Sequence, residues 1–587
     1  MPVTPALTAP PPTARSAAAT VDGTLHAAMA PLTGGLSPNS LALAATDWWL
    51  HWATQPAQSG ALWLDALNRG VACLMQDLVN APGGLAQAED LRFSHPAWQT
   101  WPVAAAAARH YLATEAWWKQ ATELRGMNQH HKDVMRMCAR QWLDLLSPAN
   151  FGLLNPEVLQ QTISSGGANL AQGLTNAIDD WLRRQGLDPM QASEHPYQPG
   201  VDLAVTPGKV VLCNALVELI QYQPQTATVQ AEPIFIVPSW IMKYYILDLS
   251  PHNSMVRWLV SQGHTVFMLS WKNPQSSDAL LSMDDYLELG VFEPLATIAR
   301  RLPATPVHAA GYCLGGTLLA IAAAALSRPG KVRCAALLPP LASVSLLAAE
   351  TDFSEPGEMG VLIDESQVAM LEDLMAERGF LSGRQMAGSF QYLHSRELIW
   401  SATLREIWMG ERLRPNDLMA WNADVTRMPA AMHSQYLRRC YLNNELAQSR
   451  YPVEGRPVSL ADLHLPIFLV GTEKDHVSPW RSVYKLHLLT DAELTFVLTN
   501  GGHNAGIVTE PGHPGRHYAQ HTRHPGDPWI EPESWLPHAG RHEGSWWEAW
   551  HAWLVAQGQG VTVPARPIDD ASLPDAPGRY VHTRYRD

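Results

Sequence analysis

The stretch that decides the fold is residues 311–316, which read Gly-Tyr-Cys-Leu-Gly-Gly. An apolar run precedes it at 307–310, and a run rich in Ala and Leu follows at 317–325. This pattern predicts a strand, a sharp turn and a helix. Glycines two residues before and after Cys313 permit a strained turn, and Gly316 permits the helix to approach the sheet closely. The stretch therefore exposes a thiol above the carboxyl edge of a sheet.

The spacing is that of the G-x-S-x-G elbow of α/β-hydrolases, with sulfur in place of oxygen. A thiolate attacks thioesters readily and forms a thioester of similar energy, so the pattern favours acyl exchange over simple hydrolysis. A free cysteine is more often a buried small hydrophobic residue than a nucleophile. The flanking glycines favour the catalytic interpretation of Cys313.

Composition limits the class of protein. With 587 residues, 46% hydrophobic and 16% charged, the chain predicts a folded protein of more than one domain. Its formal net charge of -14 argues against nucleic acid as the main partner. The six cysteines form no C-x-x-C pair, which indicates a reducing compartment without a disulfide framework or a zinc knuckle. We find neither a secretory signal nor an apolar run of the roughly 20 residues that a membrane span needs, and we expect a cytoplasmic protein.

The chain divides into three expected regions. Residues 1–40 are rich in Pro and small residues and predict a flexible leader. Residues 41–195 show helical patterning and predict a helical N-terminal domain, in which we interpret the many tryptophans as core residues. Residues 196–587 predict an α/β-hydrolase-like catalytic domain with a helical cap at about 341–463.

The catalytic region predicts a mostly parallel sheet, because its short β-rich runs alternate with helical stretches. We expect the last part, from about 511 to 541, to be loop. The predicted strands lie at 209–213, 217–222, 234–237, 265–269, 307–310, 332–338, 467–470 and 494–498.

A cysteine nucleophile needs a base and an acid that orients the base, and in this fold both follow the nucleophile. Asp475 lies in the loop after the predicted strand at 467–470, and His503 lies in a glycine-rich loop after the strand at 494–498. We predict that Asp475 is the acid and His503 the base. Glu473 and His476 are the competing candidates in the first loop.

An oxyanion hole requires two backbone N–H groups, one after the nucleophile and one in the loop after an early strand. Leu314 supplies the first in this prediction, and Trp240, after the strand at 234–237, supplies the second. A tryptophan at a strand end is equally often a packing residue. We interpret Asp248 as a residue that caps a helix or braces this loop.

Beyond the elbow, ordered motifs cover nearly everything after the leader, and with them the chain resembles the polyhydroxyalkanoate synthases, by length the class I type. The matching segments include 91–93, 155–157, 164–167, 205–211, 243–249, 271–274, 284–286, 421–424, 436–438, 544–547 and 577–580. So many matches in order are far more specific than the elbow alone.

The resemblance implies an acyltransferase that polymerises (R)-3-hydroxyacyl groups, with short chains such as 3-hydroxybutyryl expected, from coenzyme A thioesters into a polyester. Cys313 would carry the acyl group, His503 would act as its base, and Asp475 would orient His503 or assist activation of the substrate hydroxyl. No metal or organic cofactor is expected. A homodimer, attachment to polymer granules and phasin-like neighbours are also implied. The alternative is a thioesterase or depolymerase-like hydrolase that uses the same triad with water as acceptor, and a third hypothesis is a granule scaffold with a vestigial site.

Overall fold

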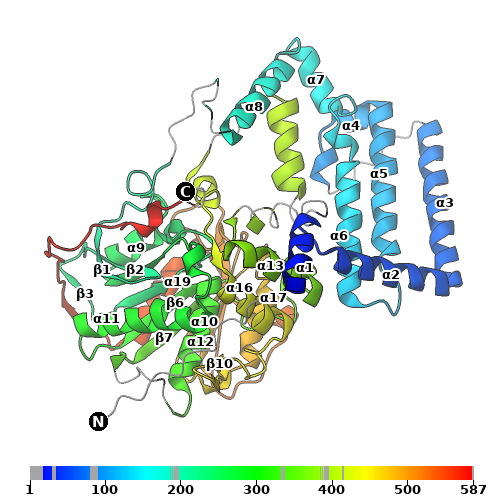
Figure 1. Cartoon of the computed structure of the whole chain (residues 1–587). Helices are drawn as coiled ribbons and strands as arrows, with labels where there is room; N and C mark the ends of the chain where they lie inside the picture. Colours follow the sequence, from blue (N-terminus) through cyan, green and yellow to red (C-terminus); the bar gives the residue numbers. More distant parts are fainter. Residues whose placement is uncertain are drawn as a thin grey trace.

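The fold combines a large sheet, a segment that covers its carboxyl edge and a group of helices beside it (Figure 1). The computed structural model describes residues 17–29, 33, 35–79, 90–185, 187, 190, 197–330, 332, 337–383, 385–386, 388, 395–412 and 415–584. In this part of the chain no helix is both long enough and apolar enough to cross a membrane.

The central sheet has ten strands in the order β1-β2-β5-β4-β6-β7-β12-β13-β14-β15. The six strands from β5 to β13 in this order run parallel, and the strands at both ends are antiparallel. This order and the helices on both faces confirm the predicted α/β-hydrolase class. The strands of the sheet are β1 (Gly208–Cys213), β2 (Val217–Tyr222), β4 (Ile234–Val237), β5 (Val266–Trp271), β6 (Val307–Tyr312), β7 (Leu341–Leu347), β12 (Ile467–Thr472), β13 (Leu494–Thr499), β14 (His517–Arg523) and β15 (Gly540–Glu543).

Two apolar layers bury the sheet. On one face pack α11 (Glu293–Arg301) and α12 (Leu314–Ser327), the latter buried from Leu314 to Ala325 because its residues are apolar all round. On the other face pack α9 (Met255–Ser261) and α19 (Trp546–Gln557). The parallel strands are thus covered on both sides, which explains why most of their residues are apolar.

The N-terminal region is helical, as predicted. Figure 1 shows α3, α5 and α6 side by side at the end of the molecule that lies away from the sheet. The helices of this region are α1 (Ala17–Met29), α2 (Pro38–Thr54), α3 (Pro56–Val79), α4 (Ala97–Thr100), α5 (Pro102–Ala121), α6 (Gln129–Leu145), α7 (Pro156–Ser164) and α8 (Ala168–Arg184).

The prediction of a flexible leader over residues 1–40 is wrong in two places, because residues 17–29 form the helix α1 and residues 38–40 belong to α2. Helix α1 packs on α13 (Glu365–Arg378), and the ring of His26 lies 2.7 Å from the carboxylate of Asp373. A partner more than 300 residues away stabilises this short helix, and no local pattern predicts such a contact. The rest of the leader, residues 1–16, lies outside the described residues.

The chain between β7 and β12, residues 348–466, forms the cap. Its described residues are mainly helical. The predicted start of the cap at 341 is wrong because residues 341–347 form β7 of the central sheet. The predicted strand at 332–338 falls largely on residues outside the described part. Besides α13, the cap contains η8 (Gly357–Leu362), β8 (Phe380–Leu381), η9 (Arg396–Ser401), η10 (Leu404–Trp408), α15 (Asp417–Asn422), β9 (Met428–Pro429), α16 (Ala430–Tyr436), η11 (Leu437–Leu442), β10 (Pro452–Val453), β11 (Arg456–Pro457) and η12 (Leu460–Asp462).

The predicted loop at 511–541 is also wrong in part. It contains β14, the helix α18 (Pro532–His538) and the start of β15. Strand β15 is fully exposed and β14 is only partly buried, so neither carries the apolar pattern of a core strand.

Candidate active site

The turn at Cys313 joins β6 to α12 and holds the cysteine in a strained conformation. Cys313 has φ 52° and ψ −124°, a left-handed region that side chains rarely adopt. Strain of this kind concentrates at functional sites, where the surrounding structure enforces it. The turn therefore has the strand–turn–helix geometry of a nucleophile elbow.

The glycines of the elbow are needed because other backbone segments approach them closely, and none of them has a positive φ. A Cβ on Gly311 would lie 2.5 Å from the Cα of Gly316, and a Cβ on Gly315 would lie 2.2 Å from the carbonyl oxygen of Val237. Both neighbours are backbone atoms, which cannot move aside cheaply. The positive φ falls on Cys313 itself, which is where our sequence interpretation differs from the structure.

His503 and Asp475 meet at the carboxyl ends of β13 and β12. Nδ1 of His503 lies 2.8 Å from Oδ2 of Asp475, and the Asp475 side chain is fully buried. The other carboxylate bonds come from the Thr472 hydroxyl to Oδ2 and from the backbone N–H groups of Val477 and Ser478 to Oδ1. Four donors thus fix this carboxylate, which in turn fixes the ring of His503.

The electrostatics of the site link His503 to Cys313. Burial by itself would lower the pKa of His503, but the charges of Asp475 and Cys313, and hydrogen bonds with both side chains, raise that pKa well above its usual range. A raised imidazole pKa favours the imidazolium form of His503. The three residues can therefore hold the thiolate–imidazolium pair that makes a cysteine nucleophilic.

The competing acid of the same loop faces elsewhere. Glu473 is partly exposed, and its carboxylate lies 3.8 Å from the ring of His517. The backbone carbonyl of His476 accepts a hydrogen bond from the N–H of Glu358 in the cap. Of the two carboxylates in this loop, Asp475 is the one that His503 contacts.

The loop after β4 lies against the first turn of α12. A Cβ on Gly315 would lie 2.5 Å from the carbonyl oxygen of Pro238. Leu314 begins α12, so its N–H belongs to the first turn, where N–H groups have no acceptor within the helix. The two segments predicted to form the oxyanion hole are therefore neighbours.

The side chain of Trp240 packs in the core. Its ring meets those of Trp271, Tyr286 and Tyr436 at centroid distances of 5.8, 5.2 and 6.3 Å. Its backbone carbonyl accepts a hydrogen bond from the hydroxyl of Thr426 in the cap. These contacts fix the backbone of the loop, and the role of the Trp240 N–H in an oxyanion hole stays a prediction.

Asp248 braces the same region, as the sequence predicts. Its buried carboxylate accepts hydrogen bonds from the hydroxyls of Thr206, Ser254 and Tyr222.

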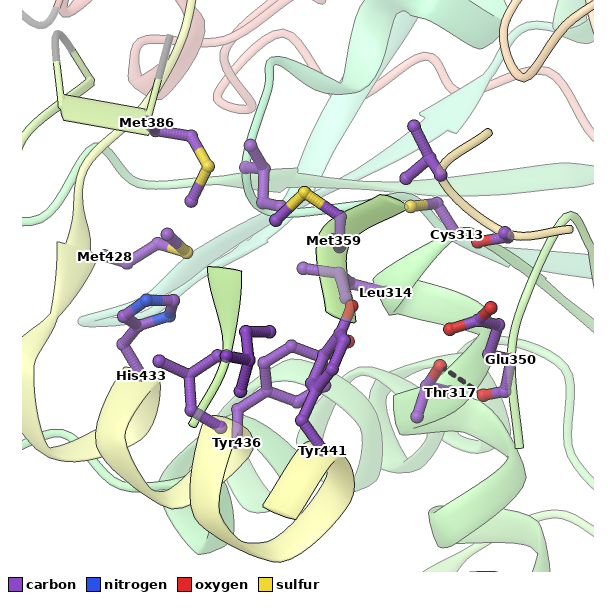
Figure 2. A pocket seen from close by; sticks show the side chains of 15 residues that line it. Cys313, Leu314, Thr317, Glu350, Met359, Met386, Met428, His433, Tyr436 and Tyr441 are labelled. Atoms are coloured by element: carbon purple, nitrogen blue, oxygen red, sulfur yellow. Dashed lines mark hydrogen bonds between the residues drawn. The ribbon is translucent and has the colours of Figure 1, made fainter. Parts of the chain in front are cut away.

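A pocket opens at Cys313 under the cap (Figure 2). Figure 2 shows Thr317 and Glu350 on the same side of the pocket as Cys313, and His433 on the opposite side. The remaining lining is largely apolar and comes mainly from the cap, including Met359, Ile363, Met386, Met428 and Leu437. Such a lining favours an apolar ligand over water.

Two polar residues of this pocket were missed from the sequence. Glu350 is 4% exposed, and burial, followed by the charges of Asp475 and Cys313, raises its pKa well above the usual range. His433 is equally buried, and burial lowers its pKa to about 4. Neither residue belongs to a recognisable sequence motif. The pocket that both residues line is formed by segments that are far apart in the sequence.

Within the described residues we find no group of three or more His, Cys, Asp and Glu side chains that is arranged to hold a metal ion.

These features define a protein of the α/β-hydrolase fold, in which a cysteine stands at the turn after β6 and a histidine contacts an aspartate at the ends of β13 and β12. Comparison with known families agrees, since the model described as alpha/beta hydrolase fold matches residues 232–509. Two further family models, Poly-beta-hydroxybutyrate polymerase (PhaC) N-terminus and Poly-beta-hydroxybutyrate polymerase N terminal, match residues 89–259 and 16–58.

Relatives extend over most of the chain. The poly(3-hydroxyalkanoate) polymerase of Methylorubrum extorquens is 38% identical over 529 residues, which are 89% of this chain and 85% of the relative. The PhaC subunits of the Rhizobium etli and Cupriavidus necator polymerases are 37% and 35% identical, covering 84% of this chain each and 77% and 83% of the relatives. The chain belongs to the poly(3-hydroxyalkanoate) polymerase family, whose members are enzymes of the acyltransferase type.

Proposed function

We propose that the protein polymerises (R)-3-hydroxyacyl groups from coenzyme A thioesters, with Cys313 as the covalent acyl carrier. Short acyl chains such as 3-hydroxybutyryl are the expected substrates. The observation that carries the proposal is the contact of His503 with Asp475 at 2.8 Å beside a strained cysteine, in a chain of the polymerase family.

In the first step the thiolate of Cys313 attacks the thioester carbonyl carbon of the substrate. The charge that develops on the carbonyl oxygen is stabilised by the N–H groups of Leu314 and Trp240, each donor contributing roughly 10²- to 10³-fold in rate. The carbon–sulfur bond to coenzyme A then breaks, and His503 protonates the departing thiolate. The product is an acyl thioester on Cys313.

In the second step the 3-hydroxyl oxygen of another hydroxyacyl group attacks this thioester. His503 accepts the hydroxyl proton, an ester bond forms, and the Cys313 thiolate leaves. Conversion of a thioester into an oxoester is downhill, so this step needs no other source of energy. The apolar cap lining favours the hydroxyl over water as acceptor.

The N-terminal helices support a proposed contact with polymer or with a second copy of the chain. Helix α3 exposes several large apolar side chains, of which Trp63 is 58% and Leu78 is 79% exposed. Clusters of this kind mark interaction surfaces. A homodimer, phasin-like partners and a place at the surface of polymer granules in the cytoplasm accordingly remain part of the proposal.

The test is the fate of the acyl group when purified protein meets (R)-3-hydroxybutyryl-coenzyme A. Chromatography resolves free 3-hydroxybutyrate from high-mass polyester, and release of coenzyme A is followed in parallel. We expect polyester, and we expect Cys313→Ala to form none. Free acid as the product would instead identify a thioesterase, and unchanged activity of Cys313→Ala would contradict the nucleophile assignment.

A further inference from the structure

Glu350 is a buried carboxyl group with an unused oxygen in the pocket of Cys313. It follows β7 by three residues, and its backbone carbonyl accepts a hydrogen bond of 2.7 Å from the hydroxyl of Thr317 on α12. Its side-chain Oε1 is fully buried and has no hydrogen-bond partner among the described residues. Figure 2 shows the carboxyl group pointing into the pocket.

The charged groups near Glu350 are already paired. Lys485, a basic residue near it, contacts the carboxylate of Glu355 at 2.5 Å and the hydroxyl of Ser354 at 2.8 Å. His503 is held by Asp475. With burial and two negative neighbours acting on it, Glu350 favours the neutral acid, whose O–H is a hydrogen-bond donor.

A buried polar group without a partner costs about 1–3 kcal/mol, and a ligand that supplies the partner recovers that cost. A bound acyl chain would supply the missing partner. Its thioester oxygen belongs to the oxyanion hole, and in a 3-hydroxyacyl group the next oxygen lies on carbon 3.

We propose that Glu350 hydrogen-bonds to the oxygen on carbon 3 of the acyl group held at Cys313 and selects 3-hydroxyacyl over unsubstituted acyl chains. A site built to bind a hydroxyl discriminates strongly against the analogue that lacks it, because its own polar group then stays unpaired. The inference rests on the proposed function and assigns the part of the substrate that this residue recognises.

The experiment compares single-turnover acylation of the full-length protein by (R)-3-hydroxybutyryl-coenzyme A and by butyryl-coenzyme A, with release of coenzyme A measured after rapid quenching. We expect the wild type to favour the hydroxyacyl substrate at least tenfold in kcat/KM. Glu350→Leu lowers this ratio by about tenfold or more, whereas Glu350→Gln stays within about threefold because its amide still donates a hydrogen bond.

Two controls separate recognition from damage to the site. Glu473→Gln changes a carboxyl group in a loop beside the site that lies outside the pocket and faces His517, and it leaves the ratio unchanged. The rate at which iodoacetamide alkylates Cys313 stays the same in all variants if the nucleophile is intact.

Equal rates for the two substrates in the wild type overturn the inference, even if Glu350→Leu fails to fold. An unchanged ratio in a folded Glu350→Leu also overturns it. Failure of the proposed function looks different, because then wild-type Cys313 is not acylated by the hydroxyacyl substrate at all, and the inference falls with it.

Discussion

Two neighbouring loops near Cys313 each hold a buried carboxyl group, and the two groups differ in how many hydrogen bonds they accept from the protein. The loops follow β12 and β7, which pair as parallel strands. Asp475 in the first loop accepts four hydrogen bonds. Glu350 in the second leaves Oε1 without a partner among the described residues.

Asp475 is held in one position by the protein, whereas Glu350 has an oxygen that is available to a ligand. A carboxylate whose donors all come from the protein has one position and can orient His503 in every step of the reaction. A buried oxygen without a partner lowers stability, and at a functional site a bound ligand recovers that cost. The predictions below start with the fixed carboxylate.

The largest effect is expected from Asp475→Asn. The neutral amide cannot raise the pKa of His503, so the thiolate–imidazolium pair becomes less populated and the ring loses its orientation. We predict a fall of roughly 10³-fold or more in the rate of coenzyme A release.

Glu473→Gln is the matched control, since this carboxylate lies in the same loop but faces His517. We predict that this variant releases coenzyme A at a rate within about threefold of the wild-type rate. A fall of less than about tenfold in Asp475→Asn would show that the triad is assigned to the wrong acid.

An opposite effect on stability is expected from Glu350→Leu. Leucine has a similar volume and leaves no unpaired polar atom in an apolar pocket. We predict that the free energy of unfolding rises by about 1–2 kcal/mol, measured from urea denaturation. A fall of about 1 kcal/mol or more would make Glu350 a structural residue and would remove the contrast with Asp475.

The smallest effect on activity is expected at Asp364, a carboxylate in the cap that accepts several hydrogen bonds, as Asp475 does, but lies outside the pocket. Burial acts to raise its pKa, but hydrogen bonds from His130, Ser40 and the N–H of Gln367 lower it from 3.8 to about 2. A depressed pKa stabilises the folded state above the unfolded value, and this contribution disappears as the pH falls from about 4 to about 2.

Asp364→Asn should therefore lower the free energy of unfolding by about 1–2 kcal/mol at pH 7. The difference in this free energy between the variant and the wild type should become smaller below about pH 4. Thermal melts at several pH values check this, while the rate of coenzyme A release per folded molecule stays within about threefold. Equal melting temperatures at pH 7 would show that this contact between the cap and the N-terminal helices adds no stability.

The sequence predicts two strands of the core to the residue. β2 and β4 begin and end at the predicted residues. β7 was not predicted as a strand, because Ser343 and Ser345 interrupt its apolar pattern. In the structure these serines are buried, because the ring of His308 contacts the Ser343 hydroxyl and the indole of Trp550 donates to that of Ser345.

The candidate site divides in the same way. Cys313, Asp475 and His503 follow an ordered motif that a single chain displays, so their proximity could be predicted. Glu350 has no such signal, because it lines the pocket together with residues such as Tyr436 and Tyr441, which lie about 90 residues further along the chain. Contacts that only the folded cap creates cannot be read from local pattern.

The most direct test of the central claim is the mass of the peptide that contains Cys313 after single turnover with (R)-3-hydroxybutyryl-coenzyme A and acid quenching. We predict that this peptide gains one or more 3-hydroxybutyryl groups, which hydroxylamine removes, and that Cys313→Ala gains none. An unmodified Cys313 peptide from protein that releases coenzyme A, or the acyl group on another residue, would contradict the account.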